Sequence, residues 1–123
     1  MRKKILIVDD SPEIVRMYTT FLEGVGYAVV GFTDGGAAIC RYRANPAEFD
    51  AVVLDYDMPG LDGEQVFFVL RSINPSLRAV FASSGMPADR QKKLFEFGAA
   101  FLQKPFPLSR LARAIEDAVG GRP

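Results

Sequence analysis

Carboxylate side chains stand at two places in this chain where a run of apolar residues ends. Asp9 and Asp10 follow the apolar run at 5–8, and Asp55 follows the run at 51–54. Carboxylates that are brought together repel one another and raise one another's pKa unless a cation lies among them. Magnesium prefers oxygen ligands and commonly joins one or two carboxylates to phosphate oxygens. The three aspartates therefore predict a Mg2+ site, which Mn2+ could also occupy.

Each aspartate also has a simpler interpretation. Asp9 and Asp10 could cap the helix that follows them, and Asp55 could be an ordinary turn residue. The combination of all three favours chemistry over capping. A carboxylate at the exit of a strand, with a metal ion beside it, can attack phosphorus and form an aspartyl phosphate. We therefore take Asp55 as the candidate nucleophile.

Two further side chains could bind the oxygens of a transferred phosphoryl group. Lys104 supplies a mobile ammonium, and Pro105 directly after it allows a cis peptide that would aim the lysine side chain. Ser84 offers a hydroxyl just past the fourth apolar run, and the register favours it. Ser83 is the adjacent alternative, because strand ends are predicted only to within a few residues.

The elements that must position these residues alternate along the chain. Runs rich in aliphatic or β-branched residues predict five strands, at 5–8, 28–32, 51–54, 77–82 and 99–102. Helical periodicity and end signals predict five helices: from the Ser11 cap to Gly24 and Gly26, after the Asp34 cap, at 64–72, at 88–97 and at 108–119. In the first helix, the predicted inward face consists of Ile14, Tyr18, Phe21 and Val25.

Strict alternation of strands and helices implies right-handed crossovers and a parallel sheet covered on both faces. The predicted fold class is therefore three-layer α/β. Ligands bind such sheets beyond the carboxyl ends of the strands. The acidic residues, the serines and Lys104 all stand at predicted strand ends, so this edge of the sheet is the expected site.

Composition narrows the function further. The 123 residues suit one domain, predicted at 1–120 with a tail at 121–123, and 15 basic residues balance 15 acidic ones. No basic run exceeds the one at 2–4 and no apolar stretch approaches a membrane span, so we expect neither direct nucleic-acid binding nor membrane insertion, and a cytoplasmic location. Because histidine is absent, Ser-His and Cys-His catalysis and His-based zinc sites are excluded. Cys40, the single cysteine, is expected to be a small buried hydrophobe.

Taken together, the motifs resemble the receiver domain of bacterial two-component response regulators. The matching segments follow one another in order, at 5–10, 53–63, 84–85 and 104–106, and the resemblance covers nearly the whole chain. It implies a flavodoxin-like, doubly wound (βα)5 fold with a five-stranded parallel sheet in the order 2-1-3-4-5. It also implies that Asp10 and Asp55 hold the metal with help from Asp9, that the backbone carbonyl of Asp57 is a further ligand, and that Asp55 is phosphorylated.

The resemblance implies a signalling switch whose only chemistry is its own phosphorylation and dephosphorylation. A histidine kinase or histidine phosphotransfer protein would donate the phosphoryl group to Asp55. The hydroxyl of Ser84 would then move inward, and Phe101, three positions before the lysine, would fill the space. The surface of the fourth helix, fifth strand and fifth helix would change for contacts with a downstream effector protein, and phosphorylation could also drive homodimerisation.

The sequence leaves three points open. Asp57 occupies a position that is more often neutral in the family, and its charge could either tighten metal binding or repel the phosphoryl group. Asp55 and Asp57 also resemble the paired aspartates of haloacid-dehalogenase-like phosphatases, and a phosphate-independent interaction module is a further alternative. The sequence does not identify the kinase, the pathway or the output, nor whether the chain acts alone or as part of a longer protein.

Overall fold

The computed structural model describes residues 2–120, so the predicted tail at 121–123 lies outside the described residues. Its strands are β1 (Lys4–Val8), β2 (Ala28–Phe32), β3 (Ala51–Asp55), β4 (Ala79–Ser83) and β5 (Ala99–Gln103). Its helices are α1 (Pro12–Gly24), α2 (Gly35–Ala44), α3 (Gly63–Ile73), α4 (Ala88–Glu96) and α5 (Leu108–Gly120), with a short 3-10 helix at Pro46–Glu48. Strands and helices alternate as predicted.

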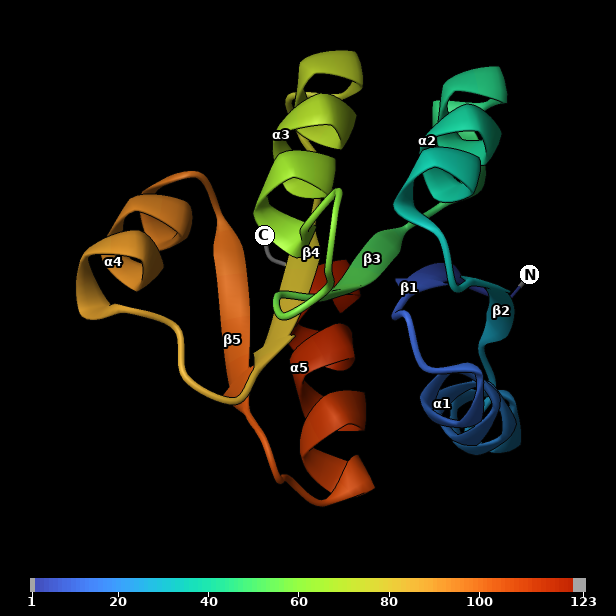
Figure 1. Ribbon diagram of the computed structural model, residues 1–123. Helices are drawn as coiled ribbons and strands as arrows, with labels where there is room; N and C mark the ends of the chain where they lie inside the picture. Colours follow the sequence, from blue (N-terminus) through green and yellow to red (C-terminus); the bar gives the residue numbers. More distant parts are fainter. Residues whose placement is uncertain (1, 121–123) are drawn as a thin grey trace.

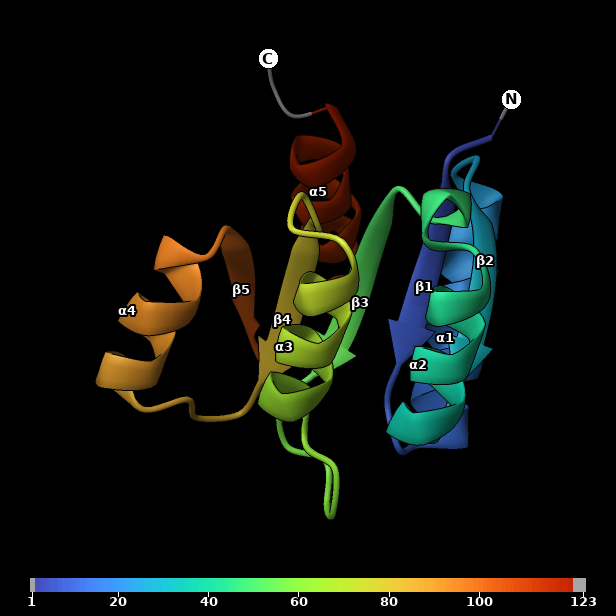
Figure 2. The ribbon, with the colours of Figure 1, turned by 90° about the horizontal axis from the view of Figure 1, so that it is seen from above.

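The strands form one parallel sheet in the order β2-β1-β3-β4-β5, which confirms the predicted topology. Figures 1 and 2 show that α1 and α5 cover one face of the sheet while α2, α3 and α4 cover the other. The chain is therefore the three-layer, doubly wound α/β fold that the alternation of elements requires.

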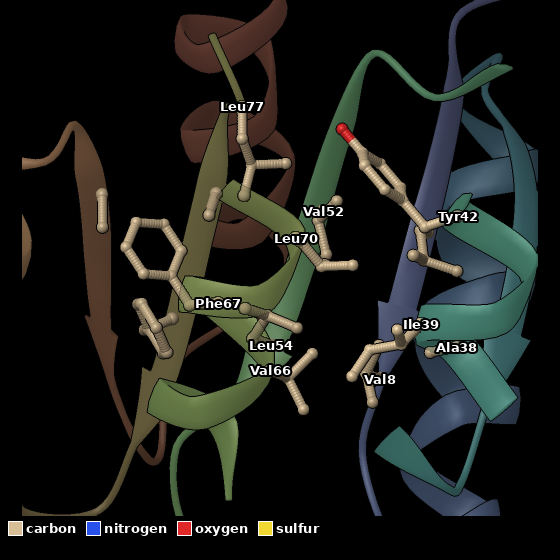
Figure 3. Close-up of a cluster of buried hydrophobic side chains, with 14 of the residues drawn as sticks. Val8, Ala38, Ile39, Tyr42, Val52, Leu54, Val66, Phe67, Leu70 and Leu77 are labelled. Carbon is tan, nitrogen blue, oxygen red and sulfur yellow. The ribbon is translucent and has the colours of Figure 1, made fainter. Parts of the chain in front are cut away.

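Two apolar layers hold the helices on the sheet because successive strand residues point to opposite faces. In β1, Leu6 and Val8 pack under α2 and α3, while Ile5 and Ile7 pack under α1 and α5. Figure 3 shows the first of these layers, with Phe67 and Leu70 of α3 turned onto the sheet. Since β1, β3 and β4 are covered on both sides, their carboxyl ends are held in fixed relative positions.

The predicted helix signals lie where the structure uses them. Ser11 caps α1 by accepting a hydrogen bond from the Ile14 amide at 3.3 Å, and Asp34 caps α2 by accepting one from the Ala37 amide at 2.8 Å. Gly98 follows α4 with a φ of +91°, a conformation that favours glycine. Both acceptors satisfy amides that the first turn of a helix leaves free.

Two packing predictions are wrong. Val25 is 53% exposed because α1 ends at Gly24, and Leu22 is buried in its place. Cys40 is exposed rather than buried. The inward face of α2 is made by Ala38, Ile39 and Tyr42, and the next position after Ile39 turns toward solvent.

Among residues 2–120, no helix has the length and apolar character needed to cross a lipid bilayer.

Candidate metal and phosphoacceptor site

The structure brings the three predicted aspartates together. Val8 pairs with Leu54 in the parallel ladder of β1 and β3, so Asp9 and Asp55 leave adjacent strands at the same edge. One carboxylate oxygen from each of Asp9, Asp10 and Asp55 lies within 4.8 Å of the others. Asp9 and Asp55 are buried, and Asp10 is exposed. This arrangement gives a cluster of carboxylates that is buried on the side of Asp9 and Asp55 and open to solvent at Asp10.

Asp9 shows why the cluster suits a cation. Its Oδ1 accepts a hydrogen bond from the Ser11 amide at 2.9 Å, while its buried Oδ2 has no hydrogen-bond partner. Burial raises the pKa of Asp9 to about 6; the Ser11 amide opposes this shift, and the charge of Asp55 adds to it. A buried oxygen without a partner, beside two more carboxylates, fits a hard divalent ion such as Mg2+. Asp9 is therefore not the cap of α1, a role that Ser11 fills, and its Oδ1 instead holds the turn before that helix.

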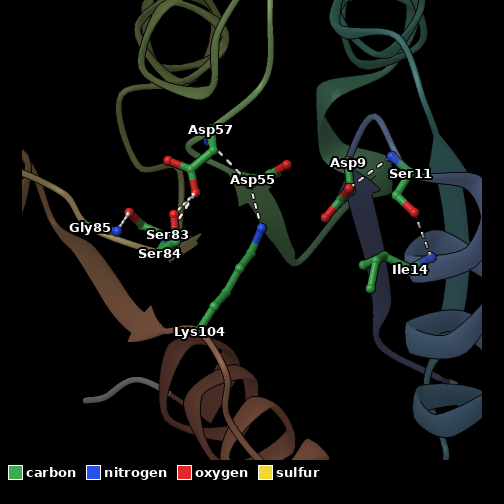
Figure 4. A network of polar contacts seen from close by, with 9 residues as sticks. All are labelled: Asp9, Ser11, Ile14, Asp55, Asp57, Ser83, Ser84, Gly85 and Lys104. Atoms are coloured by element: carbon green, nitrogen blue, oxygen red, sulfur yellow. Dashed lines mark hydrogen bonds and ion pairs between the residues drawn. The ribbon is translucent and has the colours of Figure 1, made fainter.

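Lys104, which directly follows the edge strand β5, extends its side chain into the acidic site (Figure 4). Its Nζ donates to Oδ1 of Asp55 at 2.9 Å, and the Asp57 amide donates to the same oxygen at 3.1 Å. The peptide bond between Lys104 and Pro105 is cis, as the sequence allowed. Desolvation lowers the pKa of Lys104, but its hydrogen bond to Asp55 and the surrounding carboxylates outweigh this effect, and the net pKa is raised. Lys104 is therefore a cation throughout the neutral range.

The two candidate serines have different surroundings. Ser83 is the last residue of β4 and is buried, and its Oγ accepts from the Gly85 amide at 3.1 Å. Ser84 is exposed, and both its amide and its hydroxyl donate to Oδ2 of Asp57, at 2.9 Å and 3.1 Å. The sequence left two opposite effects of the Asp57 charge open, and it did not indicate Ser84 as the partner of Asp57.

Phe101 lies on β5, half-buried, with its ring stacked on that of Phe81 at a centroid distance of 6.0 Å. It lines a cavity of about 330 Å³ together with Ser83 and Met86. Ser83 and Phe101 thus line one space, whereas Ser84, the serine that the sequence favoured, does not line it. The packing of Phe101 against Phe81 also fits the simpler role of a core residue.

Comparisons with known proteins agree with this geometry. The family model for the response regulator receiver domain matches residues 5–116. The regulatory protein VanRc of Enterococcus gallinarum is 35% identical over 92% of this chain and 48% of its own length. The response regulator GtcR of Aneurinibacillus migulanus is 38% identical over 92% of this chain and 46% of its own length.

Solved structures show the same likeness. A response regulator receiver domain protein from Clostridium thermocellum has a TM-score of 0.89 at 25% identity, with 95% of this chain and 94% of that chain covered. The chemotaxis protein CheY4 of Vibrio cholerae has a TM-score of 0.85 at 26% identity, with coverage of 96% and 99%.

The fold and the acidic strand-end site thus define a phosphoacceptor module of two-component signal transduction. The chain belongs to the response regulator receiver domain family. It spans about half the length of the curated regulators named above.

The raised pKa of Asp9 predicts a pH dependence of both stability and metal binding. Between the unfolded pKa of 3.8 and the folded value of about 6, the native state binds the extra proton, so the metal-free protein loses stability as pH rises through this window. The loss is on the order of 1–3 kcal/mol. Mg2+ requires the ionised carboxylate, so stabilisation by Mg2+ is expected to grow over the same window.

Thermal unfolding at pH 5 and pH 7.5, with and without Mg2+, measures both trends, and a variant with Asp9→Asn should lose them. Equal Mg2+ stabilisation at both pH values would contradict the prediction.

Proposed function

We propose that Asp55 is the phosphorylated residue of this receiver domain, which would occupy residues 1–120. The supporting observation is the convergence on one edge of the sheet of Asp55, the acidic pair and Lys104. The donor would be a phosphohistidine on a histidine kinase or histidine phosphotransfer protein, and a cytoplasmic location stays a prediction. The role is that of a switch, in which the chain is itself the substrate.

In the proposed reaction, a carboxylate oxygen of Asp55 forms a bond to phosphorus while the P–N bond of the donor breaks. The donor imidazole keeps the electron pair of that bond and takes up a proton from solvent. Lys104 already donates a hydrogen bond to Oδ1 of Asp55, so it holds the carboxylate in place and offers its ammonium to a phosphoryl oxygen. Asp9, Asp10 and Asp55, with the Asp57 carbonyl as the expected further ligand, would hold Mg2+, whose charge offsets that of the carboxylates and the phosphoryl group.

The experiment that tests this proposal is phosphorylation by a small donor. The purified chain is incubated with acetyl phosphate and Mg2+, with and without a chelator, and its intact mass is measured. We expect a single phosphoryl adduct that requires the metal. If neither acetyl phosphate nor beryllofluoride alters the protein, a phosphate-independent interaction module becomes the better account.

We further propose that Ser83, rather than Ser84, carries the hydroxyl of the switch. Ser83 is buried at the end of β4 and shares a cavity with Phe101, so its movement would open space for that ring. The Ser84 hydroxyl is instead engaged by Asp57. This assignment chooses the second of the two serines that the sequence left open.

A matched pair of variants separates the two serines. Ser83→Ala is expected to leave phosphorylation in place but to remove the coupling between phosphorylation and the Phe101 environment. Ser84→Ala, which deletes the same hydroxyl one residue away, should keep this coupling. Side-chain NMR of Phe101 with and without beryllofluoride measures it, and the assignment fails if Ser84→Ala removes the response while Ser83→Ala preserves it.

The output surface that we propose lies at α4, β5 and α5. A groove of about 500 Å³ runs there, with Phe95 of α4 at its side. Apolar residues line it together with the charged residues Arg78, Arg110, Arg113 and Asp117. Phe95 is 69% exposed and adds an apolar side chain to this face. The edge of β5 and the Phe101 cavity adjoin this groove, which supports it as the face where a downstream protein, or a second copy of the chain, would sense phosphorylation.

A further inference from the structure

The side chain of Asp57 is turned away from the acidic cluster and toward the end of β4. Its Oδ2 accepts two hydrogen bonds from one residue, from the Ser84 amide at 2.9 Å and from the Ser84 hydroxyl at 3.1 Å. Figure 4 shows these contacts beside Asp55 and Lys104. Asp57 and Ser84 are 27 positions apart, so the contact ties the loop after β3 to the loop after β4.

The contact lies next to the proposed phosphoacceptor. Asp55 pairs with Ala82 in the ladder of β3 and β4, so Ser84 is two residues past the partner of Asp55. The Asp57 amide donates to Asp55 while the Asp57 carboxylate holds Ser84. The Asp57 carboxylate therefore already accepts hydrogen bonds from an amide and a hydroxyl at the strand end where a phosphoryl group would arrive.

A phosphoryl group on Asp55 would bring strong acceptor oxygens and close to two negative charges to this edge. Hydrogen bonds from amides and hydroxyls to such oxygens are strong, so the phosphoryl group would compete with Asp57 for the same donors. The like charge of Asp57 would also oppose the phosphoryl group directly. Both effects make the phosphorylated state less favourable relative to the unphosphorylated one.

We propose that Asp57 is a positioning residue that favours the unphosphorylated state by holding Ser84, and that phosphorylation releases Ser84 from it. The inference rests on the proposed function of Asp55. It answers the question that the sequence left open about the Asp57 charge, because the carboxylate engages the β4 end rather than the cluster of Asp9, Asp10 and Asp55.

Beryllofluoride, which mimics a phosphoryl group on aspartate, is the probe for the test. Its affinity is measured at saturating Mg2+ for the wild-type chain, for Asp57→Asn, which removes the charge, and for Asp57→Ala, which removes the contact as well. Asp89→Asn is the control, since it deletes one exposed acid from α4 and changes net charge equally. We expect both Asp57 variants to bind beryllofluoride more tightly, by on the order of 5-fold, and Asp89→Asn to match wild type within 2-fold.

A second readout follows the contact itself. The Ser84 amide resonance is expected to shift when beryllofluoride is added to the wild-type chain, and to be shifted already in Asp57→Ala without it. A merely structural role for Asp57 would not shift this amide, in Asp57→Ala without beryllofluoride, in the direction that beryllofluoride produces in the wild-type chain.

Weaker or unchanged beryllofluoride binding in both Asp57 variants would overturn the proposal, and so would a Ser84 amide that ignores the anion. Failure of the proposed function would look different, because the wild-type chain would then bind no beryllofluoride at all. The two failures are therefore distinguishable within one set of titrations.

Discussion

Replacement of Asp55 by asparagine is expected to abolish the phosphoryl adduct completely. An uncharged amide oxygen is a poor nucleophile toward phosphorus, and the substitution also removes the carboxylate that Lys104 contacts at 2.9 Å. The substituted side chain has nearly the same shape, so the buried position should still pack. Intact mass after incubation with acetyl phosphate and Mg2+ measures the result, and circular dichroism checks that the variant is folded.

Asp57→Asn is the matched comparison for this experiment. It removes a carboxylate two residues away, yet under the proposed function it keeps the acceptor and therefore the adduct. An adduct that survives in Asp55→Asn would contradict the assignment. Loss of the adduct in Asp57→Asn alone would place the nucleophile at Asp57 instead.

The strand-end residues could be predicted because their positions follow from chain order. In a parallel sheet every carboxyl end lies at the same edge, so an aspartate after β1 and another after β3 must approach each other once the strands pair. Asp9, Asp10 and Asp55 needed no knowledge of side-chain packing to be grouped. Lys104 followed from the same argument, because it comes directly after β5.

The contacts that the sequence could not predict depend on side-chain direction within one or two residues. Ser83 and Ser84 are neighbours of the same type, and only the exact end of β4 decides which one is buried. The Asp57 contact to Ser84 joins two loops whose conformations are not specified by any periodic pattern. Such choices depend on tertiary packing.

The limits of α4 were predicted to within one residue, at 88–97 against Ala88–Glu96, although the apolar pattern of this helix is weak. Leu94 is its only buried residue, so the apolar pattern that defines a helix is weak there. The helix packs on β5, and the ion pair of Arg90 with Glu64 and the edge-on contact of Phe97 with Phe68 join it to α3. These contacts come from residues far apart in sequence, which periodicity does not detect.

Gly63→Ala is expected to destabilise the protein by about 3 kcal/mol, with a fall in Tm of roughly 10 °C. Gly63 is the first residue of α3, and a Cβ there would lie 2.2 Å from the backbone oxygen of Asp55 and 2.9 Å from the Cα of Tyr56. Both contacts are with backbone, which cannot rotate aside. Helix propensity alone predicts that the substitution stabilises the protein, since alanine is the better helix former. The close approach of α3 to the end of β3 should decide the outcome.

The same substitution should reach the phosphoacceptor, because relief of the clash must shift the turn that carries Asp55. We therefore expect Gly63→Ala to slow phosphorylation by acetyl phosphate even at a temperature where the variant is folded. Gly24→Ala is the control, since a Cβ at the end of α1 meets nothing within 4 Å, and its Tm should equal or exceed that of wild type. If Gly63→Ala were as stable and as reactive as Gly24→Ala, the backbone conformation at Asp55 would not require glycine at position 63.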